Sequence, residues 1–198
     1  MAQMEHSFAT PAPAGLAALA VAAFGFAAVF FGKVGLGGLP LLAAWLIGGG
    51  IVQFTTAVIE LKDHNITGGN VFLFFAAFFM FAAALSTLAK FGMIIFKIQP
   101  LPLVEGYMWM AGATFLTLVT PAYIRSSSLF FVALIVADAI LWCICLLDMG
   151  IIDPKAWKPV VGYLLLFLGC AGLYLSGATL CNTVFGRAIY PVPKPLVK

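Results

Sequence analysis

Long apolar runs separated by short polar segments follow one another along almost the whole chain. The runs carry few charged residues and approach the roughly 20 residues that an α-helix needs to cross a bilayer. They do not alternate apolar and polar positions, as the strands of a membrane barrel do. The pattern therefore predicts an all-α membrane protein, with six transmembrane helices in a single domain over residues 1–198. The expected spans are about 12–31, 39–61, 70–90, 106–124, 129–149 and 160–185.

Composition agrees with a membrane protein. The chain is 64% hydrophobic and 9% charged, whereas soluble domains have about 25% charged residues. Its net charge of +3 is spread over the loops without a basic run, so we expect no nucleic-acid partner. The short N-terminus carries Glu5 and His6 and lacks the basic region of a cleavable signal. The sequence thus predicts a multi-pass protein of the cell membrane, surrounded by lipid.

Reactive side chains are sparse. All four cysteines lie in apolar segments without a set of histidine or acidic ligands beside them, so we expect small buried side chains and neither a metal site nor a cofactor. The spans also hold no Ser/His/Asp set and no paired carboxylates. This pattern argues against an enzyme.

The first apolar run begins at a proline-rich threshold. Thr10 is expected to cap a helix that starts with Pro11 and Pro13, because proline is tolerated in the first helical turn. Gly15 then opens a run of small residues suited to close helix packing. A helix N-terminus also suits an anion, through its free N–H groups and positive dipole end. The alternative is a well-started first transmembrane helix and nothing more.

The second span carries polar residues on nearly one face. Gln53 and Glu60 are seven residues apart, and the deeper Gln53 should face protein or water. Glu60 lies at the helix end, where either an interfacial position or a place on a pathway fits. With Thr10 and Asn65, Gln53 forms the expected set of hydrogen-bond donors for a small anion.

Asp138 falls near the middle of the fifth expected span. A charged carboxylate there costs about 2.5–3.5 kcal/mol. It should face a water-filled path, pair with a partner or stay protonated. Two interpretations stay open: a proton-coupling or gating site, or a protonated aspartate hydrogen-bonded between helices.

One joint pattern runs along nearly the whole chain and comprises Pro11, Ala12, Pro13, Gly15, Leu16, Gly49, Gly50, Gln53, Glu60, Asn65, Gly68, Gly169, Tyr174, Phe185, Gly186 and Arg187. This pattern resembles the acetate uptake transporter family, the succinate–acetate permeases. Thr10 and Ala14 depart from the family signature, which has Asn and Leu at these positions. The resemblance implies a homohexamer of six-helix protomers, each with its own pathway for small monocarboxylates, and for succinate in some members.

The same resemblance implies a hydrophobic constriction in the pathway. Leu19 stands at the family's Phe position and Phe75 at its Tyr position. The third member, from the fifth helix, matches more loosely, near Ala133 or Leu134. A leucine and a phenylalanine at the first two positions leave the constriction without the family's tyrosine hydroxyl.

The resulting functional hypothesis is a transporter or channel for acetate and related monocarboxylates, coupled to protons and narrowed by an apolar passage. A passive channel for a small neutral solute such as urea or ammonia is the alternative, favoured mildly by the few cations within the spans and by Asp138. A membrane protein that senses acids or scaffolds partners is the third hypothesis.

Overall fold

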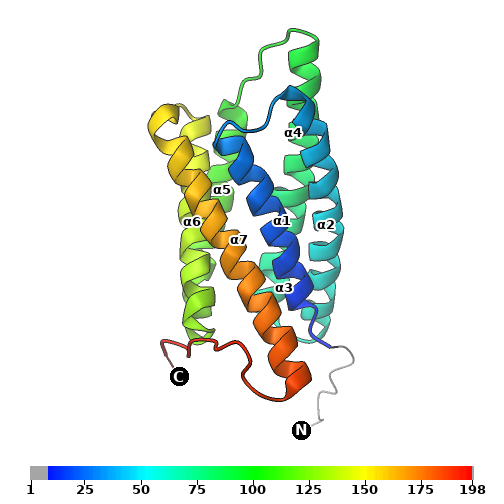
Figure 1. The fold of residues 1–198 in the computed structure, drawn as a ribbon. Coiled ribbons are helices and arrows are strands. Elements are labelled where there is room, and N and C mark those ends of the chain that lie inside the picture. Colours follow the sequence, from blue (N-terminus) through cyan, green and yellow to red (C-terminus); the bar gives the residue numbers. More distant parts are fainter. Residues whose placement is uncertain (1–8, 198) are drawn as a thin grey trace.

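The computed structural model describes residues 9–197, and the regular elements over this range are helices (Figure 1). They form one elongated bundle, with short connections at its two ends. In chain order they are α1 (Ala12–Phe30), the 3-10 turn η1 (Leu36–Gly38), α2 (Leu39–Lys62), α3 (Ile66–Phe74), the π-helical η2 (Phe75–Ala82), α4 (Ala83–Ile95), α5 (Leu103–Val119), the 3-10 helix η3 (Thr120–Arg125), α6 (Ser128–Asp148) and α7 (Pro154–Phe185).

Five helical segments within residues 9–197 are long and apolar enough to cross a membrane. α3, η2 and α4 run on as one of them, residues 66–95. α5 has 17 residues and is not among the five. The structure therefore supports the predicted all-helical membrane bundle. By length and composition it has five candidate spans among the described residues, where the sequence predicted six. The five segments are Ala12–Phe30, Leu36–Lys62, Ile66–Ile95, Ser128–Asp148 and Pro154–Phe185.

α1 lies between α7 and α2 (Figure 1) and packs most extensively against α7. Glycines let the two backbones approach. A Cβ added at Gly169 would lie 2.6 Å from the Phe24 ring, and one at Gly172 would lie 3.1 Å from the carbonyl oxygen of Leu16. Membrane helices associate through such small residues, because lipid provides no hydrophobic drive between them. The buried positions of α1 are accordingly mostly small: Gly15, Ala18, Ala20, Ala22, Ala23 and Ala27.

The glycine triplet of α2 serves helix packing. A Cβ at Gly49 would lie 3.2 Å from the Met80 sulfur, and one at Gly50 would lie 2.8 Å from the Phe81 ring, while one at Gly48 would meet nothing within 4 Å. Met80 and Phe81 belong to η2. Two of the three glycines therefore bring α2 close to the π-helical part of the third span.

The third span and α7 begin well before the residues that the sequence pattern suggests. The third span starts at Ile66 because the Asn65 side chain caps it, accepting a hydrogen bond from the Gly68 N–H (3.0 Å). α7 starts at Pro154 and not near 160, with Pro159 inside its second turn. Proline suits the first helical position, so Pro154 can begin the helix. Pro159 has no N–H to donate to the Lys155 carbonyl, but this carbonyl lies in the first turn, near the solvent-accessible end of the helix.

The C-terminal segment folds back under the end of the bundle where α1 begins (Figure 1). Asn182 of α7 holds it, since its Oδ1 accepts from the N–H groups of Ile189 (2.7 Å) and Tyr190 (3.0 Å). The Tyr174 hydroxyl also donates to the Pro191 carbonyl (2.7 Å). The start of α1, the start of α3 and the C-terminal segment therefore all lie at this end of the bundle.

Candidate functional site

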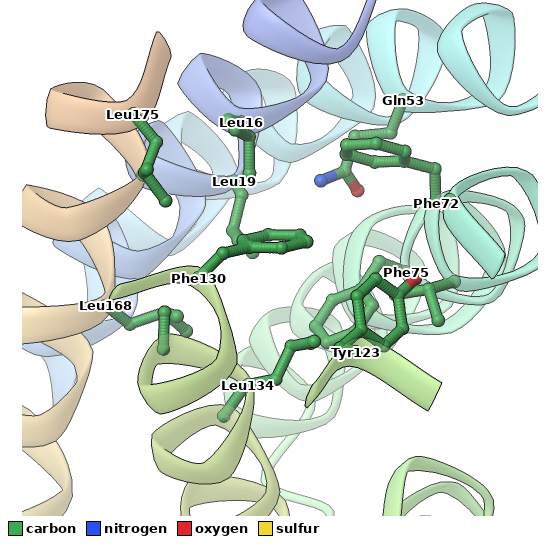
Figure 2. Close-up of a pocket in the computed structure, with 15 residues that line it drawn as sticks. Leu16, Leu19, Gln53, Phe72, Phe75, Tyr123, Phe130, Leu134, Leu168 and Leu175 are labelled. Carbon is green, nitrogen blue, oxygen red and sulfur yellow. The ribbon is translucent and has the colours of Figure 1, made fainter. Parts of the chain in front are cut away.

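A cavity of about 40 Å³ lies between α1, α2, the third span, η3, α6 and α7 (Figure 2). A cavity holds one water molecule at about 10–15 Å³ on this measure, so there is room for a small solute. The lining residues are Leu16, Leu19, Gln53, Gly68, Val71, Phe72, Phe75, Tyr123, Phe130, Ala133, Leu134, Ala137, Leu168, Gly172 and Leu175.

Gln53 and Tyr123 contribute the polar side chains of this lining. Gln53 is 1% exposed, and its Nε2 donates to the Gly15 carbonyl (3.2 Å). Its Oε1 is buried and has no hydrogen-bond partner among the described residues. The Tyr123 hydroxyl donates to the Thr67 carbonyl (2.8 Å). Figure 2 shows the Gln53 amide turned toward the space between the aromatic and leucine side chains.

The three residues expected to form a constriction meet in this cavity. Leu19 comes from α1, Phe75 from η2 and Leu134 from α6, and all three belong to the lining. Phe75 and Leu134 are buried. Ala133, the other match on the fifth expected span, also lines the cavity. Tertiary packing thus brings together side chains that are more than 100 residues apart in sequence.

Glu60 engages the donors that the sequence assigned to an anion. It is 5% exposed, and its Oε1 accepts from the Thr10 hydroxyl (2.9 Å). Its Oε2 accepts from the Asn65 amide, whose own oxygen accepts from Gly68 N–H. A carboxylate of the protein itself therefore holds Thr10 and Asn65, and a carboxylate ligand at this point would approach a like charge.

The proline threshold ties α1 to its neighbours through backbone carbonyls. The Pro11 carbonyl accepts from the Thr56 hydroxyl of α2 (3.5 Å), and the Pro13 carbonyl accepts from the Ser176 hydroxyl of α7 (2.8 Å). The helix itself begins at Ala12, so the expectation that Thr10 is the N-cap is wrong by one position. Pro11 takes the N-cap position, while the Thr10 hydroxyl accepts from the Ala12 N–H (3.3 Å) and donates to Glu60.

Asp138 is not among the residues that line the cavity. Its two carboxyl oxygens lie 2.9 and 3.0 Å from the Thr117 hydroxyl of α5. The Trp142 Nε1 donates to the same hydroxyl (3.0 Å). The next residue toward the N-terminus, Ala137, does line the cavity. Asp138 therefore lies on the α5 side of α6, where it joins the two helices.

A charged cluster lies near the C-terminal end of the third span, away from Glu60 and Asn65 at its start. Lys90 forms an ion pair with Glu105 of α5, and the Ser86 hydroxyl donates to the same carboxylate. Lys90 and Glu105 lie on opposite sides of the 96–102 connection, so the local sequence pattern gives no information on this pair.

Tyr123 and Ser176 were also missed as residues of the site region. Tyr123 follows Pro121 at the end of an apolar run, and Ser176 belongs to the polar last third of α7. Their positions alone suggest helix ends and packing. One signal could have singled out Tyr123: it lies in an apolar run, and a buried tyrosine hydroxyl usually needs a hydrogen-bond partner.

Comparison with known proteins places this geometry in context. The model of the GPR1/FUN34/yaaH family matches residues 1–194. A solved structure titled "Structure of the bacterial acetate channel SatP" superposes with a TM-score of 0.82 at 20% sequence identity, covering 94% of this chain and 99% of that one. No curated protein matches the sequence significantly. At that identity the superposition shows a shared fold.

Proposed function

Because the chain belongs to the GPR1/FUN34/yaaH family, we propose that it carries acetate and similar small monocarboxylates across a membrane. The resemblance drawn from the sequence is confirmed at the level of the family, and the chain is a multi-pass membrane protein and not an enzyme. The cavity is the observation that carries the proposal: it is small, almost wholly apolar and equipped with one buried amide. The similar fold is that of a protein named an acetate channel.

Leu19, Phe75 and Leu134 would act as the narrow part of the pathway. A short apolar passage excludes bulk water and larger solutes, and an alkyl group packs well against leucine and phenylalanine. Succinate has a second carboxyl group, which would find no partner in such a lining. We therefore expect monocarboxylates to be preferred over succinate.

We also propose a sixth span and a homohexamer. α5 continued by η3 comprises 17 and 6 residues, or about 38 Å at 1.5 and 2.0 Å per residue. That length exceeds the roughly 30 Å hydrocarbon core. Cross-linking in native membranes or native mass spectrometry would report the number of protomers.

Uptake into proteoliposomes tests the function. Radiolabelled acetate should enter faster with an inward proton gradient, and unlabelled formate and propionate should compete. Leu19→Trp places an indole in a cavity of about 40 Å³ and should lower uptake roughly tenfold or more, since 1.4 kcal/mol on the barrier suffices for that factor. Leu118→Trp, on an exposed face of α5, is the matched control and should leave uptake unchanged.

A neutral-solute channel is the competing function, because an unpaired amide oxygen also suits urea or ammonia. Urea or ammonia passing freely, with no protein-dependent acetate uptake, would assign the protein to that function. Equal uptake by Leu19→Trp and the parent protein would place the narrow passage elsewhere.

A further inference from the structure

The orientation of the Gln53 amide decides what the cavity offers a ligand. Its Nε2 faces the Gly15 carbonyl at 3.2 Å. The flipped amide would set Oε1 against that carbonyl oxygen, two acceptors in contact, so the orientation with Nε2 on Gly15 is favoured. Oε1 is then left buried and unpaired. A buried acceptor of this kind is unfavourable unless something donates to it.

Donors for an anion are scarce at this site. Among the lining residues, the Tyr123 hydroxyl donates to Thr67 and one hydrogen of Gln53 Nε2 goes to Gly15. The second hydrogen on Nε2 is the side-chain donor that remains. Thr10 and Asn65 already donate to Glu60. A carboxylate ion entering this lining would lose its hydration for one hydrogen bond, and burying an ion so poorly paired is very unfavourable.

A protonated carboxylic acid fits the same groups without this cost. Its O–H can donate to Gln53 Oε1, and its carbonyl can accept from the second hydrogen of Nε2, the two-bond pairing of an acid with a primary amide. Its alkyl group would then pack against the leucine and phenylalanine side chains of the lining. Urea satisfies the amide equally well but is polar at its other end, where this lining is apolar.

We propose that the species bound in the cavity is the neutral short-chain carboxylic acid, paired with the Gln53 amide, and not the carboxylate ion. This inference rests on the proposed monocarboxylate transport. The proton then crosses on the substrate itself: the carboxylate takes up a proton on one side, and the neutral acid releases it on the other. Proton-coupled uptake needs no titrating side chain in the lining.

Permanently neutral and permanently ionised analogues of acetate test the inference. In proteoliposomes at equal pH on both sides, acetamide should compete with labelled acetate, whereas trifluoroacetate, which stays ionised, should not. Between pH 5 and 8 the concentration of total acetate needed for half-maximal exchange should rise about tenfold per pH unit, following the neutral fraction. Tyr123 belongs to the lining, and a carboxyl oxygen of Glu60 would lie 3.2 Å from a Cβ on Gly68, another lining residue. A change at either group would alter competition by acetamide as well, so acetamide is the internal control.

Gln53→Met supplies the matched structural test. Methionine keeps the length of the side chain and removes both hydrogen-bonding groups, so exchange of acetate and competition by acetamide should fall together, roughly tenfold or more, for the loss of about 1.4 kcal/mol or more. Thr56→Val on the same helix removes the bond to the Pro11 carbonyl without touching the lining, and should keep the pH dependence. Thermal unfolding of both variants reports whether they are folded.

The outcomes distinguish a failure of this inference from a failure of the proposed monocarboxylate transport. Competition by trifluoroacetate at concentrations where acetate competes, or no competition by acetamide, would overturn the neutral-acid inference while acetate transport stands. A folded Gln53→Met variant with unchanged acetate exchange would also overturn it. Absence of any protein-dependent acetate exchange between pH 5 and 8 would overturn the proposed function and this inference with it.

Discussion

Replacing Asn65 by aspartate should destabilise the protein. Asn65→Asp keeps the oxygen that caps α3 through Gly68 N–H (3.0 Å), and aspartate caps helices as well as asparagine does. It removes the amide that donates to Glu60 Oε2. It also sets a second carboxylate beside Glu60, which is 5% exposed. The substitution therefore tests the pairing at this end of the bundle and leaves the cap in place.

The expected cost follows from two contributions. A lost hydrogen bond to a charged group costs about 1.5–3 kcal/mol. Two like charges 4 Å apart repel by about 1 kcal/mol in water and about 4 kcal/mol near a protein surface. Asn65 is exposed, so screening places the repulsion at the lower end. Together they amount to about 3 kcal/mol at neutral pH.

Thermal unfolding in detergent, followed by tryptophan fluorescence, measures the effect. For a chain of this size about 3 kcal/mol lowers the midpoint by roughly 6–12 °C. Adding Glu60→Gln exchanges the donor and the acceptor and should restore most of the loss, as expected for residues in direct contact. An unchanged midpoint for Asn65→Asp at neutral pH, or no recovery in the double variant, would refute the pairing of Asn65 with Glu60.

Two further substitutions examine helix packing and the role of the membrane-embedded carboxyl group. Gly172→Ala would place a Cβ 3.1 Å from the Leu16 carbonyl oxygen and should cost about 1–3 kcal/mol in thermal unfolding. Gly177→Ala, whose Cβ would meet nothing within 4 Å, should be neutral or stabilising; equal losses in both would contradict the close approach of α1 and α7. Asp138→Asn should retain acetate uptake and its pH dependence in proteoliposomes, because Asp138 is outside the cavity lining; a flattened pH profile would return it to the proton path.

The sequence by itself determined the class of the protein. Hydropathy and run length are local properties, and every buried backbone group in lipid must be paired within a helix or a closed barrel. Continuous apolar runs therefore predict a helical membrane bundle, and the joint spacing of its motifs predicts the family; the helical class and the family are both confirmed. Hydropathy did not determine where helices begin. The helices at Asn65 and Pro154 begin earlier than hydropathy indicates, because a single capping residue or a first-turn proline sets the start.

Only the tertiary structure decided which polar groups are available for a ligand. Thr10 and Asn65 were assigned to an anion because both are donors near a helix start, yet Glu60, 50 residues from Thr10, already accepts from them. For Asp138 the sequence left open a place on a proton path or a hydrogen bond between helices, and the packing of α6 brings its carboxyl oxygens to 2.9 and 3.0 Å from the Thr117 hydroxyl. Among the described residues, Gln53 alone keeps a buried side-chain oxygen without a hydrogen-bond partner. The rotation of each helix about its axis is set by packing against neighbours distant in sequence, and it determines which polar atoms find partners.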